Sequence, residues 1–366
     1  MALSLLRINL DPKQFSQREK LLTESGELSA SVFCFPSGVQ AIRLKNALGN
    51  LVVLPFQGQQ IWDAFMHGRR LTMKSMFDQP YPTRDFLSTF GGFLLHCGAT
   101  AMGVPGPEDK HLLHGELSNA PYQEATLLFG EDEARGTYIG MTGTYRHTVA
   151  FNYNYTATPV IKLYQGSSIF AVSMVIHNEK ASPMPLMFLE HINFRPVDGG
   201  RLVQSVRCDK SNMRVRANVP EFMEAAPGYQ EFIKDLQQHP EKHLTFMSEQ
   251  VYDPEAVFYL NYLADHQGWA RTMQIHSDGS VDIVRHRPNQ LNRCVRWICR
   301  TADQQALGVE PGTAEVEGYA AEKRKGNLRY LAGGDTFICD LEIGVLAPEL
   351  AQHETSLIEK TIAAGQ

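Results

Sequence analysis

The chain has 366 residues, of which 43% are hydrophobic and 20% are charged, and its formal net charge is −6. These values are typical of a globular protein long enough to bury a sizeable core. The acidic balance argues against a nucleic-acid partner, which would need a clustered basic face. No window approaches 18 consecutive apolar residues, so we expect no membrane-spanning helix and no membrane partner.

The N-terminal segment and the cysteines bear on the cellular compartment. Residues 1–10 carry Arg7 inside a short apolar run and lack a small-residue cleavage site, unlike a signal peptide. The six cysteines are scattered and form no Cys-x-x-Cys pair, which favours unpaired, buried thiols in a reducing compartment. We therefore expect a cytoplasmic protein.

Apolar and polar residues alternate with a period of two along much of the chain. This alternation predicts strands at 51–55, 59–66, 70–73, 160–164, 169–178, 256–265, 269–276, 281–284, 294–301, 307–309 and 336–346. Within the predicted strand 169–178, four apolar side chains are expected to share one face: Phe170, Val172, Met174 and Ile176. Helices are predicted only within 220–238, interrupted at Pro227-Gly228 and ended by Pro240, and at about 354–363.

Many short strands and few helices indicate a sandwich or barrel and not repeated βαβ units. We predict an all-β fold, a large antiparallel β-sandwich with a few short helices. A single domain is expected over 1–366, with a helical excursion at about 218–245 and a short C-terminal helix.

Three histidines stand close together in the first half of the chain. His96, His111 and His114 lie within nineteen positions, beside glycines that allow a backbone to approach a ligand closely. A single histidine of this kind is more often a structural, hydrogen-bonded residue, but three together favour a site. The pattern His111-x-x-His114-x-Glu116 also resembles a loose metal-ligand spacing.

Two further segments place charged groups at the ends of apolar strands. Glu190 and His191 follow the apolar residues 185–189, and burying such a pair costs free energy unless it is hydrogen-bonded or functional. Glu310 follows the apolar run 307–309 and precedes Pro311-Gly312. A carboxylate held by a rigid turn suits a general base, although an exposed charge at a sheet edge would give the same pattern.

Together these segments resemble the galactose mutarotase-like superfamily, which contains the aldose 1-epimerases. The resemblance rests on Leu113-His114-Gly115, on 189–194 (Leu-Glu-His-Ile-Asn-Phe), and on 309–313 (Val-Glu-Pro-Gly-Thr) followed by the glycine-rich turn and strand at 331–341. The stretches 91–98 and 113–119 are similar to a less-studied, aldose-epimerase-related branch of that superfamily.

The resemblance implies a galactose mutarotase-like supersandwich and a sugar mutarotase that needs no cofactor and no metal. It implies Glu310 as catalytic base and His191 as catalytic acid. His114, His96 and His111 would contact the hydroxyl groups of a small-molecule aldose. Trp297 is a candidate for stacking on the sugar ring, although its place in an apolar strand also fits a core residue.

Some features of the superfamily have no clear counterpart in this sequence. The Asn-Arg pair that precedes the His-Gly motif cannot be placed, and three residues compete for the role of the middle-loop aspartate: Asp253, Asp265 and Asp282. Arg69, Arg70 and Arg84 keep an anionic sugar open, because an arginine fork binds such groups. An unphosphorylated aldose is nevertheless favoured, since no basic cluster accompanies the three segments.

Two other functions compete with mutarotation. A metal-dependent sugar isomerase or lyase would use His96, His111, His114 and Glu116 as ligands. A non-catalytic carbohydrate-binding protein would keep the fold without the chemistry. The sequence leaves open whether the protein is a monomer or a homodimer.

Overall fold

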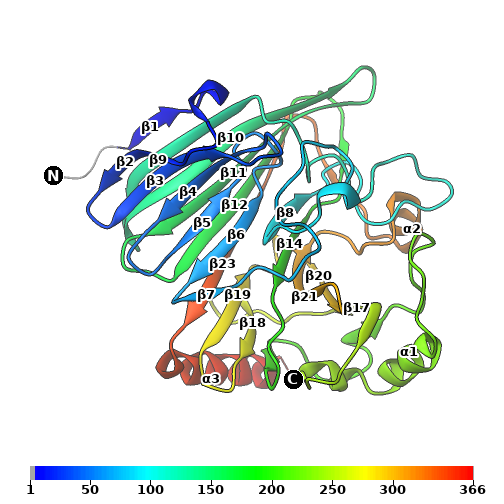
Figure 1. Ribbon diagram of the computed structural model, residues 1–366. Coiled ribbons are helices and arrows are strands. Elements are labelled where there is room, and N and C mark those ends of the chain that lie inside the picture. Colours follow the sequence, from blue (N-terminus) through cyan, green and yellow to red (C-terminus); the bar gives the residue numbers. More distant parts are fainter. Residues whose placement is uncertain (1–4, 366) are drawn as a thin grey trace.

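The computed structural model describes residues 5–365, which form two large antiparallel sheets packed face to face (Figure 1). Residues 1–4, which belong to the segment considered above for a targeting signal, lie outside the described residues. The predicted all-β class and antiparallel sandwich are confirmed.

The first sheet has nine strands. Their spatial order is β1 (Leu6–Asn9), β9 (Glu124–Asp132), β10 (Gly136–Val149), β11 (Tyr153–Tyr164), β12 (Ile169–Asn178), β23 (Thr336–Leu346), β19 (Val281–His286), β18 (Ala270–Ile275) and β15 (Arg201–Gln204).

The second sheet has twelve strands and carries the candidate site described below. Its order is β16 (Met213–Val215), β17 (Tyr252–Leu260), β20 (Arg293–Arg300), β21 (Gln305–Gly312), β14 (Leu189–Phe194), β8 (Leu94–Cys97), β6 (Ile61–Met66), β5 (Gly49–Val53), β4 (Gln40–Lys45), β3 (Leu28–Cys34) and β2 (Lys20–Ser25), with β7 (Arg69–Arg70) paired to β6. Strands β13 (Met184–Leu186) and β22 (Arg329–Leu331) form a separate small sheet.

Helices are short and peripheral. They are α1 (Tyr229–Gln238), α2 (Tyr319–Lys325), α3 (Pro348–Ala364) and the 3₁₀ turns η1 (Pro12–Gln14), η2 (Leu87–Thr89) and η3 (Pro240–Leu244). Helix α1 begins after Gly228, whose left-handed φ of 82° reverses the chain, so the stretch 220–227 is not helical. Helix α3 begins six residues earlier than the sequence suggested, with Pro348 in its first turn. None of the helices within residues 5–365 is long and apolar enough to span a membrane.

The main core lies between the two sheets. In β12, Phe170, Val172, Met174 and Ile176 are buried there, while the residues between them are only half-buried, as the alternation predicted. The six cysteines are all unpaired, as expected. Four are buried, but Cys34 is only half-buried and Cys208 is exposed, so the expectation of buried thiols is wrong for Cys208 and holds only in part for Cys34.

A second apolar cluster covers the outer face of the twelve-stranded sheet. It joins strand residues such as Leu95, Leu189 and Val295 to loop residues such as Phe86 and Phe90. This cluster surrounds the candidate functional site.

Candidate functional site

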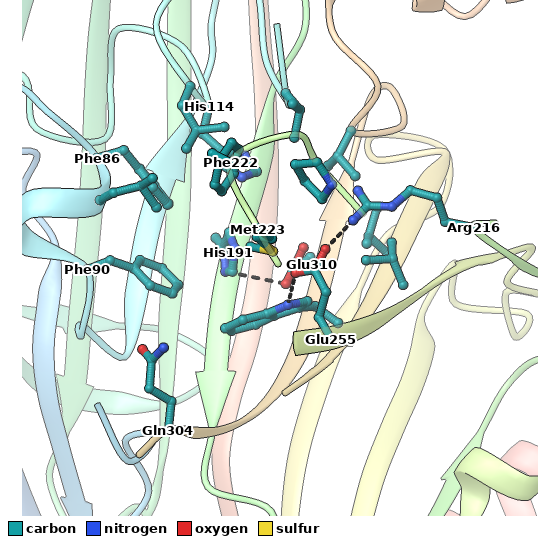
Figure 2. A pocket seen from close by; sticks show the side chains of 18 of the residues that line it. Phe86, Phe90, His114, His191, Arg216, Phe222, Met223, Glu255, Gln304 and Glu310 are labelled. Carbon is teal, nitrogen blue, oxygen red and sulfur yellow. Dashed lines mark hydrogen bonds and ion pairs between the residues drawn. The ribbon is translucent and has the colours of Figure 1, made fainter. Parts of the chain in front are cut away.

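Five neighbouring strands of the twelve-stranded sheet, β16, β17, β20, β21 and β14, each position one side chain at the candidate site. Strands β17, β20, β21 and β14 carry Glu255, Trp297, Glu310 and His191, and Arg216 follows directly after β16. All five side chains line one cavity of about 240 Å³ (Figure 2). Residues that are far apart in sequence therefore meet because their strands are neighbours in the sheet.

His191 and Glu310 form the centre of this cavity. Nδ1 of His191 lies 3.4 Å from Oε1 of Glu310, and the two residues are 4% and 2% exposed. Neither atom has a hydrogen-bond partner among the described residues. Gly308 leaves room for the carboxylate, because a Cβ at that position would lie 2.2 Å from Oε1 of Glu310.

The two groups have pKa values that are displaced in opposite directions. Burial, followed by the nearby charge of Glu255, raises the pKa of Glu310 well above its ordinary value, although Arg296 and Arg216 partly oppose this. Burial lowers the pKa of His191 to about 4. Both shifts disfavour the charged forms of these two groups.

Glu255 links the remaining polar side chains of the site. One of its carboxylate oxygens accepts a hydrogen bond from Arg216, and Oε2 accepts one from Nε1 of Trp297 at 2.7 Å. The indole of Trp297 therefore has a polar partner at its edge while its ring lies 5.6 Å from the His191 ring. Trp297 lines the cavity and is not enclosed in the core.

His114 reaches the same cavity from a loop. Its backbone has φ of 56°, and the following Gly115 (φ 82°) packs so closely against the carbonyl oxygen of Ala101 that a Cβ would lie 2.3 Å from it. The His114 ring lies 5.4 Å from the His191 ring, and its Nδ1 is buried without a partner. Burial and the neighbouring His191 lower the pKa of His114 well below its usual value, which leaves a neutral imidazole available to a ligand.

The structure does not bring His96 to this cavity. Because side chains alternate along a strand, His96 points to the opposite face of the sheet from Leu95, which packs on the outer face near His191. There Nδ1 of His96 lies 2.8 Å from Oε2 of Glu190, and both side chains are fully buried. The expectation that His96 contacts the same substrate as Glu310 is therefore corrected.

His111 also lies outside the Glu310 cavity. Its ring contacts the carbonyl oxygen of Leu112 at 2.8 Å through Nδ1 and accepts from the backbone N–H of Tyr319 at 3.3 Å. It lines a different cavity, which it shares with Glu116 and Arg84. The expectation that His111 contacts the same sugar as Glu310 is therefore corrected as well.

The four side chains considered as metal ligands do not converge. His96 lies between the sheets, His114 lines the Glu310 cavity, and His111 and Glu116 line the other cavity. Within residues 5–365, no three His, Cys, Asp or Glu side chains gather closely enough to hold a metal ion. The loose spacing in the sequence therefore does not become a coordination geometry.

The aspartates and arginines considered from the sequence are used elsewhere. Asp265 pairs with Arg271 at 2.7 Å, and Asp282 pairs with Arg69 at the same distance. Arg70 pairs with Asp63 at 2.8 Å, Arg84 donates to the backbone carbonyl of Glu116, and Asp253 does not line the Glu310 cavity.

Sequence reasoning missed Glu255 and Arg216. Glu255 lies only two residues beyond the candidate Asp253, directly before the strand predicted from residue 256. Arg216 belongs to a run in which charged and apolar residues alternate, Met213-Arg214-Val215-Arg216. That alternation was a usable signal for a short edge strand.

The fold is the one shared by aldose 1-epimerases and galactose mutarotase-like proteins. A crystal structure from Klebsiella pneumoniae, named as a candidate aldose 1-epimerase, superposes with a TM-score of 0.79 over 98% of this chain and 92% of that one, at 17% identity. A galactose mutarotase-like protein from Clostridium acetobutylicum has a TM-score of 0.56 and 13% identity over 87% and 99% of the two chains. A candidate aldose 1-epimerase from Escherichia coli has a TM-score of 0.52 and 15% identity over 81% and 96%.

Residues 36–345 match the family model described as "Domain of unknown function (DUF4432)". The chain therefore belongs to this family. No curated protein matches the sequence.

Proposed function

We propose that this protein is an aldose 1-epimerase-type isomerase, which interconverts the α and β anomers of a free aldose by general acid/base ring opening. The observation that supports this most directly is the Glu310–His191 pair. It is buried and faces a cavity of about 240 Å³, somewhat smaller than a typical small-molecule site. The structural relatives named for this activity support the same reaction class.

The reaction requires one proton to leave the substrate and another to arrive. In the reactive form of the pair, Glu310 is ionised and His191 carries the proton. Glu310 then removes the proton of the C1 hydroxyl, and His191 donates its proton to the ring oxygen as the bond between C1 and that oxygen breaks. The open-chain aldehyde forms, C1 rotates, and the same steps in reverse close the ring on the other face. Each positioned proton transfer contributes about 10²–10⁴-fold.

The other polar groups position the sugar. The unpartnered Nδ1 of His114 is available to a hydroxyl or to the ring oxygen. Trp297, held at its edge by Glu255, offers a flat apolar surface to the C–H face of a pyranose. No step in this scheme draws on a redox group or a cofactor.

The test is anomer exchange measured by polarimetry on a panel of aldoses, with and without EDTA. We expect acceleration over the spontaneous rate that persists in EDTA. Acceleration that EDTA abolishes would favour the metal-dependent alternative. Binding without acceleration for every sugar on the panel would favour a carbohydrate-binding protein.

A further inference from the structure

The cavity has two walls of different chemistry. The polar wall is formed by His114, His191, Arg216, Glu255 and Glu310, whereas the amide of Gln304 lies below Phe90 in Figure 2. The apolar wall is formed by Met76, Phe86, Leu87, Phe90, Phe222 and Met223. Figure 2 shows Phe86 and Phe90 on one side of the cavity and Arg216 and Glu255 on the other, with His191 and Glu310 between them.

The polar wall carries no free positive charge for an anionic substrate. Arg216 is paired with Glu255, and the second carboxylate oxygen of Glu255 is taken by Trp297. Glu310 adds a second carboxyl group on the same wall, and no other Lys or Arg side chain lines this cavity among the described residues. A phosphate, sulfonate or carboxylate on the sugar would therefore meet no unpaired Lys or Arg side chain among the described lining residues, which favours a neutral substrate.

Arg216 and Glu255 are engaged with each other, which leaves His114, His191 and Glu310 on the polar wall for a sugar. His191 and Glu310 are occupied at C1 and the ring oxygen in the proposed reaction, and His114 lies beside them. Hydroxyl groups near the anomeric carbon can use these groups. A ring whose C1 lies at this pair also packs against Phe86 and Phe90, whose ring centroids lie 4.7 Å from that of His114 and 5.4 Å from that of His191, respectively.

The apolar wall extends from the interior of the cavity to its mouth. Inside, the rings of Phe86 and Phe90 stack at 4.9 Å between centroids. At the mouth, Met76, Leu87 and Phe222 are 67%, 45% and 49% exposed, so the rim is apolar as well. A hydroxyl pressed against this wall would lose water without gaining a partner, whereas a methyl group would gain from leaving water.

We propose that the substrate is a neutral 6-deoxyaldose, whose methyl group packs against the apolar wall. This inference rests on the proposed function and names the class of sugar that the same site prefers. The preference comes from the apolar wall, and the acid and base act at C1 and the ring oxygen.

The experiment compares sugars that differ only in the group at C6. Suitable pairs are L-fucose with L-galactose, L-rhamnose with L-mannose, and D-fucose with D-galactose. For the pair that fits the site, we expect kcat/KM for anomer exchange to favour the deoxy sugar by about 10- to 200-fold, the range found for small groups in apolar pockets. Binding is measured independently from Trp297 fluorescence, with Trp297→Phe identifying the signal.

A change on the apolar wall should reduce this preference. Met223→Gln places an amide there with little change in volume, so the ratio of deoxy to parent sugar should fall toward one. Met247→Gln is the matched control, because Met247 is 49% exposed and does not line the cavity. Its ratio should equal that of the unmodified protein.

The possible outcomes separate the substrate class from the reaction. Anomer exchange that is equal or faster for the parent sugars overturns the inference and leaves the proposed function standing. Tighter binding of deoxy sugars without any exchange overturns the proposed function and supports the inference. If no sugar of the panel is bound or exchanged, both are wrong.

Discussion

Two histidine–carboxylate pairs sit back to back on strand β14, and only one of them has the features of a catalytic pair. Glu190 points between the sheets, where its Oε2 lies 2.8 Å from Nδ1 of His96. His191, the next residue, points outward, where its Nδ1 lies 3.4 Å from Oε1 of Glu310. The inner pair is fully buried against the core, whereas the outer pair lines a cavity.

The two pairs contain the same residue types. They differ in whether they line a cavity and in the distance between their facing atoms. The two residues of the inner pair are hydrogen-bonded to each other at 2.8 Å, and neither lines the cavity of the outer pair. The outer pair is longer and keeps its facing atoms without other partners, so a substrate oxygen can replace the internal contact. The inner pair is therefore expected to stabilise the fold and the outer pair to act on the substrate.

The largest expected effect separates the two pairs by activity. Glu310→Gln removes the base and should lower kcat for anomer exchange by about 10²–10⁴-fold. Glu190→Gln keeps an acceptor for His96 on the inner face and should leave kcat within about threefold of the unmodified protein, because its side chain points away from the cavity and makes no contact that strengthens in the transition state. Both variants are compared by polarimetry at saturating sugar. Equal losses in the two variants would contradict the division of roles.

The next effect separates the pairs by stability. His96→Ala leaves the carboxyl of Glu190 buried without its partner and should lower the free energy of unfolding by about 3–5 kcal/mol. His239→Ala is the matched control, because the side chain of His239 is 55% exposed. It should change stability by no more than about 0.5 kcal/mol. Urea denaturation at neutral pH gives both values, and a His96→Ala protein as stable as the control would show that the inner pair is not structural.

A smaller effect tests how the outer pair is positioned. Gly308→Ala places a Cβ 2.2 Å from Oε1 of Glu310, which is too close for the two atoms to coexist, so the base must move. Misplacement of about 1 Å costs on the order of 10²-fold in rate, and kcat should fall by up to that amount while the fold remains. Gly106→Ala is a control, because its added Cβ meets only an ordinary contact at 3.6 Å. Full activity in Gly308→Ala would mean that the carboxylate does not need its present position.

The smallest effect concerns the pH dependence of kcat/KM. The reactive form of the pair carries one proton, so activity should decline below about pH 4, where His191 gains a proton while Glu310 already carries one. Activity should decline again at high pH, above the raised pKa of Glu310, because the pair then has no proton to donate. A pH profile with stopped-flow polarimetry measures both limbs. An acid limb near pH 6.5 would indicate a histidine that is not buried as described.

Local patterns in the sequence were sufficient for much of the fold. The alternation in 169–178 identified which residues of β12 face the core, because the period of a strand is visible in a short window. The stretch 220–227 was misjudged as helical, since Phe222 and Met223 are apolar for a reason that periodicity does not reveal: they line the cavity.

The candidate site could be predicted only in part, because local sequence patterns do not show which strands become neighbours in the sheet. The structure brings His191, Glu310, His114 and Trp297 to one cavity, as the resemblance implied. His96 was misplaced because one residue of register decides which face a strand side chain occupies. Glu255 and Arg216 were missed because their role depends on the order of strands in the sheet, which local patterns do not contain.

The most direct test of the account is an NMR measurement in D₂O on an aldose that the unmodified protein binds. We predict magnetisation transfer between the α and β anomeric protons that the protein accelerates, with no deuterium appearing at C2, because only oxygen-bound protons move at Glu310 and His191. Deuterium at C2 would contradict the account, since it would require removal of a carbon-bound proton next to the aldehyde. Absence of accelerated transfer would contradict it equally.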